Sequence, residues 1–413
     1  MPSSLFCGLL SLTLAFSDCS RAARSGAAPS APSNGAAPGS VAAPAPAPAL
    51  RMGADQAERY LPLLKGKRVG VVVNQTSLVG KAHLVDTLLA QGVQVKMIFA
   101  PEHGFRGEAA DGATIKDARD TRSGLPVKSL YGATKKPTAE MLQDLDVLVF
   151  DIQDVGARFY TFISTMHYVM EAAAEQGKAV VVLDRPNPNG FYVDGPVREP
   201  AYKSFVGMDP LPIVHGLTVG ELAQMINGEK WLAGGKQCQL TVVPVLGYTH
   251  ATRYVLPVRP SPNLPNAHSV ALYPTICLFE GTDVSVGRGT DSPFEVIGSP
   301  TQPNTRPYKF TPRPNPGSPT PPQNGKLCYG LDLHQVNLDS PTGFTVRYLI
   351  DFYQQSTDKA HFFGKYFEEL SGTASLRQQI IAGKSEVEIR KSWEPGLSQF
   401  KEMRKKYLLY PEK

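Results

Sequence analysis

The chain has 413 residues, of which 42% are hydrophobic and 19% charged, and its net charge is +5. This composition excludes a disordered chain and a coiled coil, and no apolar run after the first 20 residues approaches the roughly 18 residues that span a bilayer. Lys and Arg are scattered apart from a short run at 404–406. The charge therefore gives no reason to expect a nucleic-acid partner.

The first 54 residues predict an export leader and a linker. Residues 5–16 form a largely apolar run whose length is typical of a signal-peptide core. Cys19, which follows it, is a candidate for lipid attachment. The next stretch is dominated by Ala and Pro, which favours an extended spacer over a folded core. We therefore expect an exported protein, periplasmic or extracellular.

Strand and helix patterns alternate from residue 68 onward. Val-rich or otherwise apolar runs predict strands, and amphipathic runs predict helices, of which 218–228 begins with a capping box formed by Thr218 and Glu221. This order indicates an α/β fold with a Rossmann-like parallel sheet and helices on both faces. The predicted strands are 68–73, 93–99, 127–130, 147–150, 179–183 and 240–245, and the predicted helices are 84–91, 138–145, 160–176 and 218–228.

After about residue 250 the pattern changes. Pro and Gly become frequent, and the Pro-rich stretch 300–322 predicts an irregular excursion. Helices are predicted at 345–355, 360–370, 387–393 and 396–407. We infer a smaller C-terminal α+β domain that completes a cleft with the sheet domain. The expected organisation is a signal peptide at 1–19, a linker at 20–54, a Rossmann-like catalytic domain at 55–250 and the C-terminal domain at 251–413.

Polar clusters follow four of the predicted strands. Ligands on parallel sheets bind at the carboxyl ends of the strands, so these clusters predict a binding site there. The candidates are Asn74 and Gln75 after the first strand; Glu102, His103 and Arg106 after the second; Asp151, Asp154 and Arg158 after the fourth; and Asp184, Arg185 and Asn187 after the fifth.

Motifs for several other chemistries are missing from the sequence. The first strand is not followed by GxGxxG, and there is no GxxxxGK[ST], GxSxG or HExxH. We therefore expect no cofactor. A divalent ion held by Glu102, His103, Asp151 and Asp154 stays open as an alternative. For Cys238, Cys277 and Cys328 we favour three separate buried thiols over a disulfide.

Carboxylates are abundant among the candidates, and Arg residues accompany them. Two facing carboxyl groups are suited to glycosidic cleavage, one as acid and the other as nucleophile or charge stabiliser. Arg side chains bind carboxylates in a bidentate manner, so several of them in one cleft suggest an anionic substrate. Glu280 and Arg288 in the C-terminal half add a further pair of this kind.

Several motifs together resemble those of the bacterial exo-β-N-acetylmuramidases, and the resemblance extends from about residue 58 to 411. One difference is Asn189-Gly190-Phe191, which stands where that family usually has Leu-Gly-Gly. The motifs are Asn74-Gln-Thr76, Pro101-Glu-His-Gly-Phe-Arg-Gly107, Phe150-Asp-Ile-Gln-Asp-Val-Gly-Ala-Arg-Phe-Tyr160, Asp184-Arg-Pro-Asn-Pro188, Phe279-Glu-Gly-Thr282, Ser285-Val-Gly-Arg-Gly-Thr290 and Lys405-Lys-Tyr-Leu-Leu-Tyr-Pro411.

The resemblance implies an active site between a Rossmann-like domain and a smaller C-terminal domain. It also implies release of terminal N-acetylmuramic acid from the non-reducing end of peptidoglycan fragments, without a cofactor. The lactyl carboxylate of this sugar agrees with a site that is lined by Arg.

Our hypothesis for the roles begins with Glu102 as general acid/base. Glu280 is the first choice for the second carboxylate, and Asp154 is the next. Arg288 or Arg158 would bind the lactyl carboxylate. Alternatively, the 2-acetamido group of the substrate serves as the internal nucleophile.

Two other functions stay open at this point. One is a non-catalytic peptidoglycan-binding lipoprotein that uses the same cleft. The other is a metal-dependent amidase or esterase. The sequence gives no oligomeric state.

Overall fold

The computed structural model describes residues 49–105, 117–337 and 343–413. The predicted signal peptide, Cys19 and most of the linker lie outside these ranges. Residues 51–54 were expected to belong to the linker, but they pack against the sheet. The Arg51 backbone N–H donates to Leu246 O at 3.1 Å, and Ala54 is fully buried.

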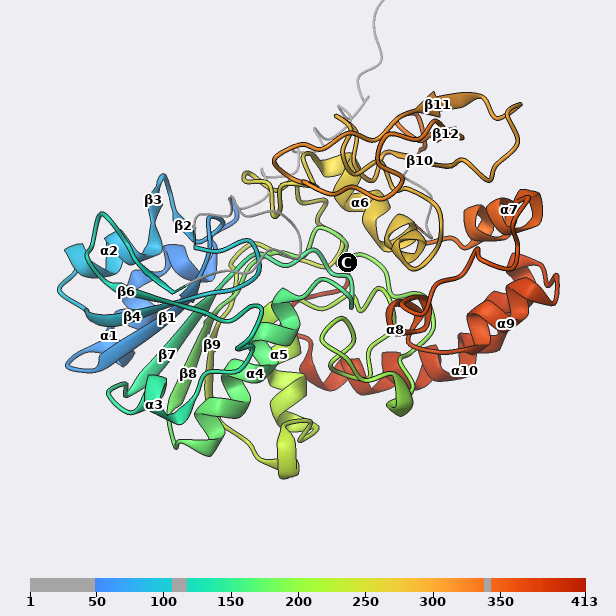
Figure 1. Ribbon diagram of the computed structural model, residues 1–413. Helices are drawn as coiled ribbons and strands as arrows, with labels where there is room; N and C mark the ends of the chain where they lie inside the picture. The colour runs from blue at the N-terminus through green and yellow to red at the C-terminus, as the bar shows by residue number, and fades with distance from the viewer. Residues whose placement is uncertain (1–48, 106–116, 338–342) are drawn as a thin grey trace, which may run out of the picture. The chain divides into compact units, whose positions relative to one another are not determined.

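A seven-stranded sheet forms the first half of the chain (Figure 1). All of its strands are parallel except the edge strand β5, which pairs with β6 in antiparallel fashion. The order is β5 (Ala118–Arg119), β6 (Pro126–Ser129), β4 (Gln94–Ala100), β1 (Arg68–Val73), β7 (Val147–Asp151), β8 (Ala179–Leu183) and β9 (Gln239–Val243). The prediction of a Rossmann-like parallel sheet is confirmed.

Helices cover both faces because alternate strand residues point to opposite sides. On one face, Val71 and Val149 pack with α1 (Ala57–Leu64) and α2 (Leu84–Ala90). On the other, Val72 and Phe150 pack with α4 (Phe162–Glu175) and α5 (Val219–Gly228). The short helix α3 (Ala139–Leu142) begins after Thr138, whose side chain accepts from Met141 N.

The C-terminal half contains a second, smaller sheet and several helices. The three-stranded antiparallel sheet has the order β10-β12-β11, and a separate hairpin, β2 with β3, lies early in the chain. The remaining elements are β2 (Leu78–Val79), β3 (Ala82–His83), α6 (Ala267–Ile276), the 3-10 helix η4 (Cys277–Gly281), β10 (Val296–Ser299), β11 (Tyr308–Phe310), β12 (Cys328–Asp332), α7 (Arg347–Gln355), α8 (Phe367–Ser371), α9 (Ser375–Ile381) and α10 (Glu386–Arg404).

Two helix predictions in this half are wrong in extent. The helix expected at 360–370 is limited to α8, because residues before it form turns. The expected pair at 387–393 and 396–407 is one continuous helix, α10, which runs through Pro395. None of the helices within the described ranges is long and apolar enough to cross a membrane.

The side chain of Arg158 joins the two halves of the chain. It is fully buried, and it donates to the carbonyls of Pro196 (2.8 Å), Leu211 (2.7 Å) and Leu370 (2.8 Å). Leu370 belongs to α8, whereas Arg158 follows β7. Burial, and then the nearby Arg198, lower the pKa of Arg158 to about 9. The guanidinium therefore acts as a structural clamp between the sheet and α8.

Replacement of this clamp is expected to destabilise the whole fold. Arg158→Met deprives buried carbonyls of their charged donor, and each such loss costs about 1–3 kcal/mol. We expect the free energy of unfolding, measured in urea, to fall by about 2–5 kcal/mol. The control Arg347→Met changes an exposed side chain and should stay within about 0.5 kcal/mol of wild type. If both substitutions changed the free energy of unfolding by equally small amounts, the role of Arg158 as a clamp would be contradicted.

Candidate active site

A cavity of about 350 Å³ brings together residues from both halves of the chain. From the sheet half, it is lined by the loop after β4, by Tyr131 after β6 and by the segment that leads into α4. From the C-terminal half, it is lined by α6, η4, the loop that carries Arg288 and the start of α8. The lining residues are Glu102, His103, Tyr131, Phe159, Tyr160, Thr161, Val206, Ser261, Leu264, Tyr273, Cys277, Glu280, Arg288, Phe294, Ser318, Pro319, Thr320, Pro322, Tyr366 and Leu370.

Glu102 enters this cavity from the carboxyl end of a central strand. Its Oε2 accepts a hydrogen bond of 2.6 Å from the Thr161 hydroxyl. Thr161 is the N-cap residue of α4, so the carboxyl group lies near a helix N-terminus, where negative charge is favoured. A hydroxyl group both donates and accepts. Thr161 can therefore keep its hydrogen bond to Glu102 when the carboxyl group gains or loses a proton.

The backbone beside Glu102 is strained. His103 has φ 68° and Gly104 has φ 78°, and Gly104 N donates to Pro101 O at 3.0 Å. Left-handed backbone is uncommon for a non-Gly residue and costs energy, so it persists where the surroundings enforce it, often at functional sites. Phe294, which also lines the cavity, has φ 64°.

Glu280 faces the same cavity from η4 and is paired with a cation. Arg288 Nε donates to Glu280 Oε1 at 2.5 Å, and the Cys277 thiol donates to Oε2 at 3.3 Å. Burial, and then the charge on Glu280, raise the pKa of Cys277 well above its usual range. The thiol therefore remains a donor and is no nucleophile. Glu280 is thus held from both oxygens, by the Arg288 guanidinium on one side and by the Cys277 thiol on the other.

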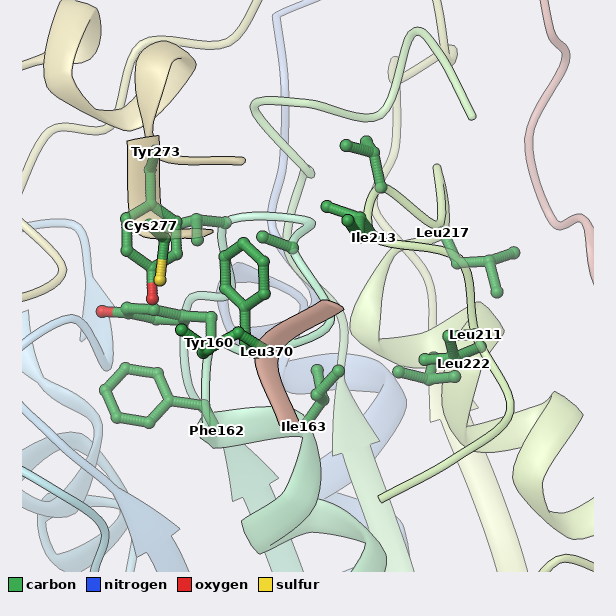
Figure 2. Close-up of a cluster of buried hydrophobic side chains, with 14 of the residues drawn as sticks. Tyr160, Phe162, Ile163, Leu211, Ile213, Leu217, Leu222, Tyr273, Cys277 and Leu370 are labelled. Atoms are coloured by element: carbon green, nitrogen blue, oxygen red, sulfur yellow. The ribbon is translucent and has the colours of Figure 1, made fainter. Parts of the chain in front are cut away.

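Aromatic rings line the cavity together with the two carboxyl groups. Tyr273 makes edge-to-face contacts with Phe159, Tyr160 and Phe294, with centroids 5.3, 5.7 and 5.0 Å apart. Figure 2 shows the hydroxyl of Tyr273 beside the sulfur of Cys277, with the ring of Tyr160 below them. A few polar groups in a mainly aromatic and apolar pocket are typical of a small-molecule site.

Several predicted site residues are buried in structural hydrogen-bond networks and do not line the cavity. Asp151 is fully buried and forms a bidentate pair with Arg185, at 2.5 and 2.9 Å. Asn74 accepts from the backbone and hydroxyl of Thr76. Asn187 donates to Leu217 O. Most of their polar atoms are directed at protein groups, with the exception of the buried Asn74 Nδ2, and their role in binding substrate stays a prediction.

Gln75 has an indirect relation to the cavity. Its side-chain amide donates to the carbonyls of Arg259 and Pro260, and the next residue, Ser261, lines the cavity. Gln75 therefore fixes one wall and makes no contact of its own with the interior.

Asp154 and Arg158 are also outside the lining. Asp154 Oδ2 accepts from Gly156 N at 2.7 Å and lies 3.6 Å from His215 Nε2. Arg158 is the buried clamp described above. Of the predicted catalytic residues, the cavity unites Glu102 and Glu280; of the predicted substrate-binding residues, it contains His103 and Arg288. Arg106 lies outside the described residues.

Several lining residues were not predicted from the sequence. Thr161 follows directly on the motif that ends at Tyr160, so its position was a usable signal. Tyr273 belongs to α6 and Cys277 begins η4, and neither of these helices was predicted. Ser318, Pro319 and Thr320 come from the Pro-rich excursion, which forms a wall of the cavity.

The described residues contain no group of three or more His, Cys, Asp or Glu that is arranged to hold a metal ion. Within the same ranges, the three cysteines are buried and form no disulfide, as predicted.

Comparisons with known proteins follow the same division of the chain. Residues 69–268 match the family described as "Exo-beta-N-acetylmuramidase NamZ, N-terminal", and residues 271–410 match its C-terminal counterpart. The peptidoglycan beta-N-acetylmuramidase NamZ of Bacillus subtilis (strain 168) is 40% identical over an alignment of 379 residues, and the match covers 85% of this chain and 89% of the relative.

Two crystal structures of DUF1343 family proteins from Bacteroides fragilis NCTC 9343 are also similar. One is 46% identical with a TM-score of 0.83, and the match covers 89% of this chain and all of that one. The other is 31% identical with a TM-score of 0.76, and the match covers 87% and 99% of the two chains.

Asp184, another predicted binding residue, belongs to one of these buried hydrogen-bond networks, and its pKa makes the effect of burial measurable. It is fully buried and accepts from Gly220 N, Thr218 Oγ1 and Tyr410 Oη. Burial raises its pKa from 3.8 to about 6. A raised pKa means that the folded state binds more protons than the unfolded state between these pH values, so the stability that this group contributes is present at low pH and is lost as the pH rises to about 6.

We therefore expect the stability difference between wild type and Asp184→Asn to depend on pH. The free energy of unfolding of wild type, minus that of the variant, should fall by about 2–3 kcal/mol from pH 4 to pH 6. Urea unfolding of both proteins at a series of pH values measures this difference. The contributions of titratable groups that both proteins share cancel in the subtraction. A difference that stays constant or rises with pH would contradict the burial argument.

Proposed function

The chain belongs to the exo-β-N-acetylmuramidase NamZ family and is a glycoside hydrolase, and we propose that it releases N-acetylmuramic acid from the non-reducing end of peptidoglycan fragments. The observation that supports this most strongly is that Glu102 and Glu280, from opposite halves of the chain, line one cavity. Hydrolysis of a glycosidic bond by two carboxyl groups requires this arrangement.

The size of the cavity supports exo action. Its volume of about 350 Å³ is at the small end of the roughly 300–1,000 Å³ that ligand sites occupy. Such a space suits a single sugar better than the middle of a polysaccharide chain. The segment 318–322 forms part of its wall. In this proposal, the terminal sugar fills the cavity and the scissile oxygen lies towards its mouth.

Glu102 is proposed as the general acid/base. In its protonated form it gives the proton to the leaving oxygen, and Thr161 then donates to the carboxylate that results. The same carboxylate can later remove a proton from the attacking water. Glu280, which Arg288 contacts through Nε, is proposed to stabilise the positive charge that develops on the sugar ring, or to orient a 2-acetamido group that attacks the anomeric carbon.

Arg288 is proposed to recognise the lactyl carboxylate. Its Nε binds Glu280, and a guanidinium carries further donors on its two terminal nitrogens. It lines the cavity over the ring of Phe294, with the guanidinium carbon 5.1 Å from the ring centroid. An Arg held in one orientation by both contacts is suited to a planar carboxylate.

Substitution of either carboxyl group should abolish most of the activity. Glu102→Gln and Glu280→Gln are each expected to lower kcat about 10²–10⁴-fold on a chromogenic N-acetylmuramic acid glycoside. The matched control Glu369→Gln changes an exposed carboxylate of α8 and should keep wild-type kinetics. Activity of Glu102→Gln within about tenfold of wild type would remove Glu102 from the acid role.

A further inference from the structure

The cavity has a buried floor and a partly exposed rim. Tyr273 and Phe294 are buried, whereas Tyr131 and Val206 are half-buried; on the opposite side, the C-terminal half contributes the exposed lining residues Pro319, Thr320, Pro322 and Tyr366. Both of these half-buried residues come from the sheet half of the chain. They mark the point at which a saccharide longer than the cavity would emerge on that side.

Two further aromatic rings continue outward from this part of the rim. Phe205 precedes Val206, and its ring centroid lies 6.1 Å from that of Tyr131, with the planes tilted by 49°. On its other side, Phe205 stacks with Tyr168 of α4, at 6.2 Å and 14°. All three rings are half-buried. We call Tyr131, Phe205 and Tyr168 the aromatic strip.

Folding alone gives little reason for the aromatic strip, because none of its members belongs to the hydrophobic core clusters found among the described residues. Each ring is nevertheless held by a rigid element. Tyr168 is on a 14-residue helix. Phe205 is at the tip of a tight turn in which Ser204 and Gly207 exchange backbone hydrogen bonds of 3.3 and 3.1 Å. Ser129 braces Tyr131 by accepting from its N–H and donating to its carbonyl.

We propose that the aromatic strip is a second subsite, which binds the sugars on the leaving-group side of the scissile bond. This inference rests on the proposed function, in which one terminal sugar fills the cavity. In this proposal, the next sugar of the fragment leaves the cavity on the side of Tyr131, which lines it. A sugar ring has apolar C–H faces that pack on aromatic rings, and its hydroxyl groups need donors nearby. Lys135, whose Nζ lies 4.5 Å from the centroid of Phe205, supplies such a donor.

The test compares two substrates of different length. One is a muramic-acid-terminated tetrasaccharide of peptidoglycan, and the other is a chromogenic N-acetylmuramic acid glycoside that has a single small aglycone. Phe205→Ala and Tyr168→Ala are each expected to raise KM for the tetrasaccharide about three- to tenfold. The same variants should keep kcat/KM for the chromogenic substrate within about twofold of wild type. Tyr131 is left intact because it lines the cavity itself.

Tyr308→Ala is the matched control. Tyr308 is also half-buried beside another ring, Phe310, at 6.1 Å, but it does not line the cavity. The Tyr308→Ala variant should therefore keep wild-type kinetics on both substrates. The second subsite is refuted if Phe205→Ala and Tyr168→Ala lower the activity on both substrates equally, or on neither. Failure of wild type to cleave either substrate would instead refute the proposed function.

Discussion

The shape of the candidate active site depends on a buried guanidinium that does not line the cavity. Arg158, which follows β7, reaches α8 and binds the carbonyl of Leu370. Helix α8 in turn packs closely on η4, because Gly281 has no side chain where Phe367 lies against it; a Cβ there would be 2.5 Å from Phe367 Cα. Since η4 carries Glu280, the distance between the two carboxyl groups is set through this clamp. A fixed distance between the two carboxyl groups matters in a glycosidase, because it determines the space available for the group that attacks the anomeric carbon.

The carboxyl edge of the sheet carries two kinds of polar residue, and only one kind faces the cavity. Asp151 and Asp184 are satisfied by Arg185 and by Tyr410, Thr218 and Gly220. Tyr410 belongs to the last few residues of the chain, so Asp184 ties the C-terminal tail to the end of β8. Burial of such groups is costly unless every partner is in place. These networks therefore fix the loops from which the cavity is built.

The sheet was predictable from the sequence because its physical pattern is local. Buried parallel strands need Val-rich runs such as Arg68–Val73, and that strand was predicted to the residue. The smaller C-terminal α+β domain was predicted, but the individual strands of its sheet were not: β11 has three residues, and its neighbours are separated by Pro-rich turns, so no run is long enough to show a period. Helix α6 was missed for a related reason. It is buried on nearly all sides and contains Pro274, so it lacks an amphipathic pattern.

Some of the predicted site residues line the cavity and others do not, and the difference has one cause. Acidic and amide residues at strand ends are used both to bind ligands and to anchor loops, and a sequence does not tell which side chains point outward. Glu102 and Asp184 each follow a strand, yet one lines the cavity and the other is enclosed by protein donors. Thr161 and Tyr273 contribute through contacts between distant segments, which local patterns do not encode.

The central claim, that Glu102 and Glu280 act on one bound sugar, is tested most directly by a crystal structure of the wild-type protein with N-acetylmuramic acid. The account predicts that the sugar fills the cavity, that the anomeric oxygen lies within roughly 2.6–3.2 Å of the Glu102 carboxyl group, and that the lactyl carboxylate contacts Arg288. A sugar bound outside this cavity, or one whose anomeric centre is out of reach of Glu102 and Glu280, would contradict it.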